Sequence, residues 1–140
     1  MSKRTTLTDW AVMICSVLAS EKTRMSAQNI SDITGLSMTI VRKLLRMLVL
    51  SGVVVSIRGV SGGYQLSRSP DQLSVARVIT AIEGYAGWIV GSAGEQSKGD
   101  PKFTQMRENW IAISKQGRQF LEKKTLSDLL EEQKASETFS

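Results

Sequence analysis

The chain has 140 residues, of which 41% are hydrophobic and 22% charged, a balance typical of a globular protein with one ordinary domain or a small domain plus a dimerisation element. Its apolar runs fall far short of the roughly 20 residues that span a bilayer, its N-terminus has no apolar signal core, and its single cysteine excludes an intramolecular disulfide framework. We therefore expect a cytoplasmic protein with no membrane partner.

The net charge of +5 is distributed unevenly along the chain. Residues 1–70 carry nine Lys and Arg against three acidic residues, a net charge of +6, whereas residues 71–140 carry nine basic and ten acidic residues, a net charge of −1. A polyanionic partner would therefore meet the N-terminal half, although domains without such a partner can also be mildly basic. The charge pattern favours nucleic acid as that partner.

Apolar residues at helical spacing predict two helices in the first 35 residues. The first covers Thr8–Ser20 and the second covers Ser26–Thr34, each beginning at a residue type that is favoured as an N-cap, and Gly35 ends the second. The side chains expected to face the core are Trp10, Met13, Ile14, Val17 and Leu18 in the first helix and Ala27, Ile30 and Ile33 in the second.

A third helix is predicted from Ser37, another N-cap, to about Ser51, with Gly52 as its stop. The short turn before it, residues 34–37, contains glycine and has the spacing of a helix-turn-helix. Its two faces differ in chemistry: Val41, Leu44, Leu45 and Leu48 form an apolar stripe, and Thr39, Arg42, Lys43 and Arg46 lie together on an exposed cationic face.

The next segment predicts a β-hairpin, which we call the wing. Residues 53–58 are β-branched and strand-like, residues 59–63 form a glycine-rich tip, and residues 64–67 return as a second strand. A fourth helix then runs from its N-cap Ser74 to about Glu83, with Val75, Val78, Ile79 and Ile82 as its buried stripe.

The C-terminal third contains a long loop and a long helix. Residues 84–102 hold five glycines and Pro101, which predicts a loop that is either functional or disordered. From about Lys102 to Lys124 a helix carries an apolar seam that either mediates dimerisation, which we favour, or packs on its own domain. The seam comprises Phe103, Met106, Trp110, Ile113, Gly117 and Phe120, and a short final helix holds Leu126, Leu129 and Leu130.

These elements predict a mainly α protein with a small β wing (α+β), that is, a winged helix-turn-helix domain plus a long C-terminal dimerisation helix. Residues 1–83 form the DNA-binding domain, 84–102 a flexible sensor-type loop, 103–133 the dimerisation helix with a short terminal helix, and 134–140 a frayed tail.

The third helix is the expected reading element, because a helix fits the major groove of B-DNA. Arg42 is the best candidate for a bidentate guanine contact, while Lys43 and Arg46 are expected to hold phosphates, and Arg58 with the glycine-rich tip suits a minor groove. The predicted DNA-binding residues are Ser26, Gln28, Ser37, Met38, Thr39, Arg42, Lys43, Arg46, Arg58, Ser61, Gly62, Gly63 and Tyr64.

Catalysis is not expected. The chain has no histidine, one cysteine and no phosphate-binding glycine motif, so the usual nucleophile–base pairs and metal sites are missing and no catalytic residue is predicted. Cys15 lies near the apolar stripe of the first helix, where packing in the core is favoured over a redox role. Trp10, Trp88 and Trp110 either pack in cores or line a ligand pocket between the DNA-binding domain and the long helix.

The string Ser56–Leu66 resembles the wing signature of the Rrf-type winged-helix regulators. Residues 78–84 resemble the fourth helix of that family, Thr8–Ala11 its start and Thr125–Leu130 its end, so the resemblance covers roughly residues 6–133. It implies a homodimer that reads a palindromic operator in double-stranded DNA, usually as a repressor, through residues 37–43 and 58–64. A winged-helix module that binds proteins and does not read DNA is the alternative, but such modules usually lose the cationic face that this chain keeps.

Many members of that family hold an iron–sulfur cluster with three cysteines from the loop that corresponds to residues 84–104. The matching positions here fall near Ser92, Lys98 and Thr104, and Asp9 matches a position that supplies a carboxylate ligand in some relatives. Clusters need thiolate or imidazole ligands, so we predict no cluster, no metal site and no other cofactor. Either the chain belongs to a branch without these cysteines that responds to an unknown small-molecule or redox effector, or the cysteines were substituted.

Overall fold

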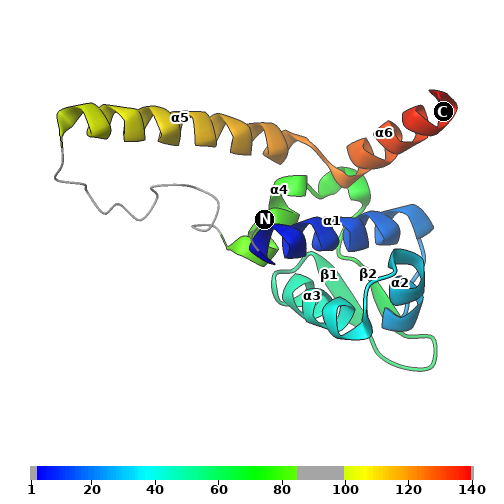
Figure 1. Cartoon of the computed structure of the whole chain (residues 1–140). Helices are drawn as coiled ribbons and strands as arrows, with labels where there is room; N and C mark the ends of the chain where they lie inside the picture. Colours follow the sequence, from blue (N-terminus) through cyan, green and yellow to red (C-terminus); the bar gives the residue numbers. More distant parts are fainter. Residues whose placement is uncertain (1–2, 85–99, 140) are drawn as a thin grey trace.

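The computed structural model describes residues 3–84 and 100–139, and its elements are mostly helical with one small sheet (Figure 1). This confirms the predicted fold class. The elements in chain order are α1 (Lys3–Glu21), α2 (Ala27–Thr34), α3 (Met38–Leu50), β1 (Val54–Ile57), β2 (Gly63–Leu66), the 3₁₀ turn η1 (Pro70–Gln72), α4 (Val75–Glu83), α5 (Pro101–Lys123) and α6 (Leu126–Phe139).

The core of the protein lies where α1 packs against α2, α3, α4 and α6. The predicted apolar stripe of α3 is entirely buried, which fixes the opposite, cationic face of that helix toward solvent. The largest fully buried side chains are Ile14, Ile30, Leu44, Leu45, Leu48, Leu73 and Leu126, together with Val41, Val53, Val54, Val78 and Cys15.

Three helices begin where serine residues predict. The backbone N–H of Asn29 donates to Ser26 Oγ at 3.0 Å, that of Ile40 to Ser37 Oγ at 3.3 Å, and that of Arg77 to Ser74 Oγ at 3.1 Å. Each bond satisfies one of the amide groups that a helix N-terminus leaves without a partner.

The first helix begins earlier than predicted. α1 starts at Lys3, so Thr8 lies buried inside the helix instead of capping it. The segment before Thr8 holds no proline or glycine, and nothing in it interrupts the helix. Two residues that we expected in the core are also exposed, Met13 by 41% and Ile33 by 54%, because the neighbouring helices cover only part of each apolar stripe.

The wing is an antiparallel hairpin of β1 and β2, in which Val54 pairs with Leu66 and Ile57 pairs with Gly63. Val54 is buried while Val55 and Ser56 are exposed, so only one end of the hairpin reaches the core. The tip therefore projects from the domain, on the same lower side of Figure 1 as α3.

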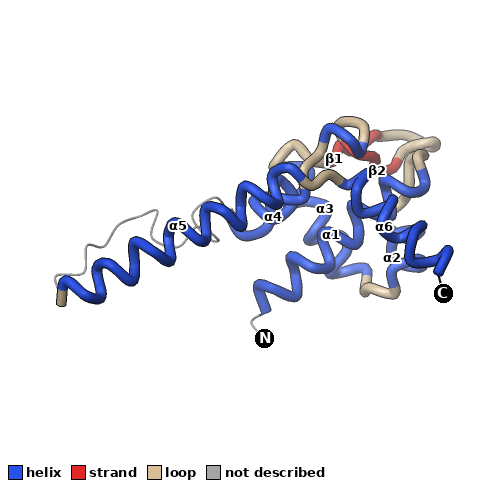
Figure 2. The backbone as a smooth tube through the Cα atoms, turned by 90° about the horizontal axis from the view of Figure 1, so that it is seen from above, coloured by secondary structure: helices blue, strands red, loops and turns tan. Residues whose placement is uncertain are grey.

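The long helix α5 stands apart from the rest of the molecule. It packs against α4, and its first half extends away from the domain in both views (Figures 1 and 2). Asp100 caps it by accepting the Lys102 N–H at 2.9 Å, which places Pro101 in the first turn, where proline is favoured. The loop predicted before it, residues 85–99, lies outside the described residues.

The last helix returns to the N-terminal half of the chain. The Val75 N–H donates to Lys124 O at 2.8 Å and the Leu126 N–H to Leu73 O at 3.0 Å, so the start of α6 is held beside the start of α4. Leu126 is fully buried against α1 and η1, which means that residues 1–83 do not close their core alone. α6 also reaches Phe139, where a tail was predicted from residue 134.

None of the helices among residues 3–84 and 100–139 is long and apolar enough to cross a membrane.

Cys15 gives a test of the packing of the core. Burial raises the pKa of its thiol from 9.0 to about 12, so the folded protein keeps the thiol protonated where the unfolded chain begins to ionise. This stabilisation is present below pH 9 and is lost as the pH rises from 9 toward 12. We expect Cys15→Ala to flatten the fall in unfolding free energy across that interval, measured by denaturant titration, and Ellman's reagent to label the wild-type thiol only after unfolding. Rapid labelling of the native protein would contradict this burial.

Candidate nucleic-acid interface

The predicted recognition helix has the geometry that groove reading requires. Thr39, Arg42, Lys43 and Arg46 are all exposed on α3, on the side opposite its buried stripe. Three guanidinium and ammonium groups on one helix face supply the phosphate contacts that dominate affinity for DNA, and arginine can also read guanine edges. The structure thus brings these predicted residues together on one accessible surface.

The turn between α2 and α3 is fixed by side-chain hydrogen bonds. Ser31 Oγ donates to Leu36 O at 2.6 Å, the Leu36 N–H donates to Thr34 Oγ1 at 3.2 Å, and Thr34 Oγ1 donates to Ile30 O at 2.7 Å. Gly35 takes a left-handed conformation with φ 76° and donates to Ser31 O at 2.8 Å. These bonds therefore fix the angle between α2 and α3, which the residue spacing in the sequence alone did not specify.

A contact that the sequence did not predict holds the wing. Met25, in the loop before α2, exchanges two backbone hydrogen bonds with Tyr64 at 3.0 and 2.8 Å, and Arg24 Nη1 donates to Ser61 O at 3.2 Å. We call these three bonds the wing clamp. No local signal could have found it, because backbone pairing between distant segments leaves no pattern of side chains.

Backbone contacts explain the two adjacent glycines of the wing differently from our expectation, and the wing clamp accounts for one of them. A Cβ on Gly63 would lie 2.8 Å from Met25 O, and its φ of 152° is one that other residues rarely adopt. A Cβ on Gly62 would overlap the carbonyl oxygen of Ile57. Gly62 is thus required by a contact inside the wing and Gly63 by a contact with the loop before α2, independently of any approach to a DNA groove.

The other predicted contact residues differ in how far their polar groups are engaged. Ser26 and Ser37 use their hydroxyls as helix caps, and Gln28 Nε2 donates to Asp32 Oδ1 at 2.9 Å. Tyr64 is half-buried against the core, while Arg58 is exposed on the wing. The cations therefore remain the most accessible part of the predicted surface.

The apolar seam predicted for the long helix lies on α5, and this α5 seam faces solvent. Its five large side chains are between 50 and 66% exposed, so the alternative that this stripe packs on its own domain is wrong. Trp110 is one of them, and Trp88 lies outside the described residues, so a pocket lined by the three tryptophans receives no support here.

Comparison with known proteins identifies the family. A family model described as Rrf2, an iron-dependent transcriptional regulator, matches residues 4–132. The regulator IscR of Sodalis glossinidius is 33% identical over 84% of this chain and 71% of its own length. The structure of CymR, the global cysteine regulator of B. subtilis, superimposes with a TM-score of 0.73 and 27% identity, and the match covers 92% of this chain and 94% of CymR. The structure of IscR of T. potens superimposes with a TM-score of 0.71 and 25% identity, and the match covers 94% of this chain and 86% of that IscR.

The residues of this chain do not fit the iron-containing group that the family description implies. The chain has no histidine, and its one cysteine is buried in the middle of α1 with its thiol protonated. In the described part of the chain no group of three His, Cys, Asp or Glu side chains could hold a metal ion. Asp9 and Thr104 are exposed and offer only hard oxygen donors, which bind clusters poorly.

We therefore expect protein purified without oxygen to be colourless, with iron and sulfide far below one equivalent per chain. Absorption spectroscopy and iron analysis on the same sample provide the measurement, and Cys15→Ala should change neither result. A visible charge-transfer band with stoichiometric iron would show that the ligand analysis is wrong.

The wing clamp predicts that a methyl group added at position 63 destabilises the folded protein. Gly63→Ala should lower the free energy of unfolding by roughly 1–3 kcal/mol, because Cβ meets the Met25 carbonyl and the backbone is strained. Ser61→Ala is the matched control, since Arg24 bonds to the carbonyl of Ser61 and not to its side chain. Equal denaturation midpoints for the two variants would mean that the clamp carries no strain.

Proposed function

Because the chain belongs to the Rrf2 family of transcriptional regulators, we propose that it is a cytoplasmic, sequence-specific repressor that binds a palindromic operator as a homodimer. One observation carries the proposal: α3, whose cationic side chains are exposed, lies on the same lower side of the domain as the tip of the wing (Figure 1). Winged-helix regulators use these two elements for adjacent grooves of one DNA segment.

The α5 seam supports the homodimer. A contiguous apolar stripe on an isolated helix is costly to leave in water, and Phe103–Phe120 corresponds to about 27 Å of helix. A second copy of this chain is the occupant that we propose, because the same stripe on both helices is self-complementary about a two-fold axis. Gly117 has nothing within 4 Å of its Cβ position, which leaves room for two helices to cross closely there.

Dimerisation also answers a problem of specificity. One winged helix contacts one half-site, which rarely discriminates enough against the many competing sites of a genome. Two recognition helices placed about 34 Å apart read two half-sites one helical turn of DNA apart. Operator fragments selected by the purified protein from genomic DNA are expected to contain such inverted repeats.

The recognition helix is tested by two arginine variants. We expect Arg42→Ala to weaken operator binding by roughly 1–3 kcal/mol and to relax preference at one base pair, because a bidentate guanine contact is lost. Arg46→Ala should weaken all sequences alike and reduce the salt dependence of binding by about one phosphate contact. Fluorescence anisotropy at several salt concentrations measures both, with Lys102→Ala on α5 as the matched cation control.

Operator binding that is unchanged in both arginine variants would remove α3 from the reading surface. Binding without steep salt dependence in the wild type would instead favour a protein-interaction module.

The α5 seam is tested by Ile113→Asp. Ile113 is 59% exposed in the protomer, so the variant should fold, but a charge at the interface should make it monomeric and abolish tight operator binding. Light scattering and operator titration measure the two effects. Gln119→Asp, an equally charged change at an exposed position away from the seam, is the control and should remain dimeric.

Gly117→Ala separates dimer contacts from helix stability. It should stabilise the isolated helix by up to about 1 kcal/mol and weaken the dimer, if two helices cross there. A wild-type mass near that of one chain, 15.4 kDa, would exclude the homodimer, as would a monomeric Ile113→Asp that bound its operator fully.

A further inference from the structure

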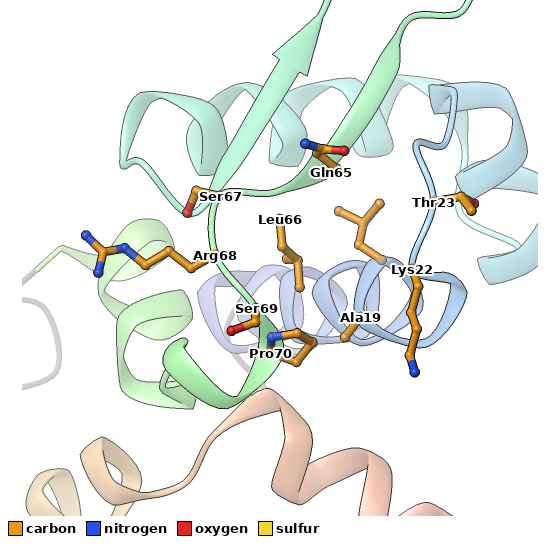
Figure 3. A pocket seen from close by; sticks show the side chains of 10 residues that line it. Ala19, Lys22, Thr23, Gln65, Leu66, Ser67, Arg68, Ser69 and Pro70 are labelled. Atoms are coloured by element: carbon orange, nitrogen blue, oxygen red, sulfur yellow. The ribbon is translucent and has the colours of Figure 1, made fainter.

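A cavity of about 370 Å³ lies between the end of α1 and the segment that leaves β2, and none of its lining residues belongs to α3 (Figure 3). Leu18, Leu66 and Pro70 are apolar residues of its lining. The side chains of Lys22 and Arg68 lie on opposite sides of Leu66, with their charged groups directed away from it (Figure 3). This volume falls in the range of small-molecule sites. The cavity thus combines an apolar centre with two cationic ends.

Two cationic side chains and one hydroxyl of the cavity lack partners in the described part of the chain. Neither Lys22 nor Arg68 forms a salt bridge within the described part of the chain. Ser67 Oγ, beside Arg68, is buried without a hydrogen-bond partner among the same residues. A buried hydroxyl without a partner costs free energy, so the packing at this end of the cavity is not optimal for Ser67.

Lys22 has a backbone conformation that favours glycine over lysine. Its φ is 58°, and among the described residues it is the one non-glycine with positive φ. Lys22 follows directly after α1, and its N–H donates to Leu18 O at 3.4 Å. Glycine is the residue that most often occupies this position after a helix. A lysine there costs conformational energy, so its side chain is better explained by a role than by the geometry of the turn.

Both walls of the cavity lead directly to the wing clamp. Lys22 and Thr23 are followed by Arg24 and Met25, and on the other side Gln65 follows Tyr64. A molecule bound between these walls therefore acts on the two segments whose backbone bonds set the position of the wing.

We propose that this cavity is an effector site for a small dicarboxylate with an apolar body, and that its occupation weakens operator binding. One carboxylate pairs with Arg68 and the other with Lys22, while the methylene chain covers the apolar residues of the lining. Neutralisation of the two cations lowers the attraction of the N-terminal half for DNA. The bound ligand also favours a position of the wing that differs from the one that DNA favours. The regulatory part rests on the proposed function, whereas the binding site does not.

The test uses adipate as the probe and the full-length protein. Titration followed by amide NMR should show saturable shifts at residues around the cavity, and hexanoate, which has one carboxylate, should bind more weakly. Arg68→Gln and Lys22→Gly should each weaken adipate binding by about tenfold or more. Lys22→Gly should also raise the melting temperature, because glycine relieves the left-handed turn, so loss of binding cannot be attributed to misfolding. Lys123→Gln is the control and should bind adipate as the wild type does.

Operator titrations at constant ionic strength supply the second measurement. Saturating adipate should lower operator affinity about fivefold or more in the wild type, and DNA should lower adipate affinity by the same factor. Absence of saturable adipate binding would overturn the proposal. An Arg68→Gln variant that lost operator affinity but bound adipate as the wild type does would also overturn it, because Arg68 would then be a phosphate contact. Failure of the proposed function is distinct, because a wild type that bound no operator would leave the NMR titration readable.

Discussion

Two backbone hydrogen bonds between Met25 and Tyr64 connect the loop before α2 to the wing, and the arrangement of the proposed DNA surface depends on them. Met25 lies just before α2, which leads into α3, and Tyr64 lies near the start of β2. The recognition helix and the wing therefore share one fixed point, although each is built from a separate segment. Gly63 follows from the same constraint, since only glycine allows the strand to pass this close to the Met25 carbonyl.

Much of the fold was predictable because its signals are local. A serine hydroxyl that accepts an amide of the next turn is decided within four residues, and Ser26, Ser37 and Ser74 all begin helices as predicted. The same rule failed at Thr8, because a capping residue type says where a helix can begin and not whether the preceding segment continues it. The extent of α6 was missed for a related reason, since no glycine or proline near residue 134 ends it.

The candidate site was predictable in composition and less so in geometry. Periodicity separated the buried and cationic faces of α3 correctly, since both faces lie on one regular helix. It could not tell which apolar side chains a neighbour would cover, which is why Ile33 was expected inside and the solvent exposure of Ile113 was decided only by the structure. The wing clamp and the position of Lys22 depend on tertiary contacts and backbone angles that residue types do not encode.

The burial of Leu126 has a consequence for how the protein is made. The DNA-binding half needs this side chain to complete its core, yet α5 and the segment before it must be synthesised first. A nascent chain emerges from the ribosome N-terminus first, so the recognition helix is exposed to the cell before its domain can close. A product interrupted within α5 would lack both the core residue and much of the seam. A completed core and a completed α5 seam are thus acquired at nearly the same moment of translation, and partial chains that lack both are left for proteolysis.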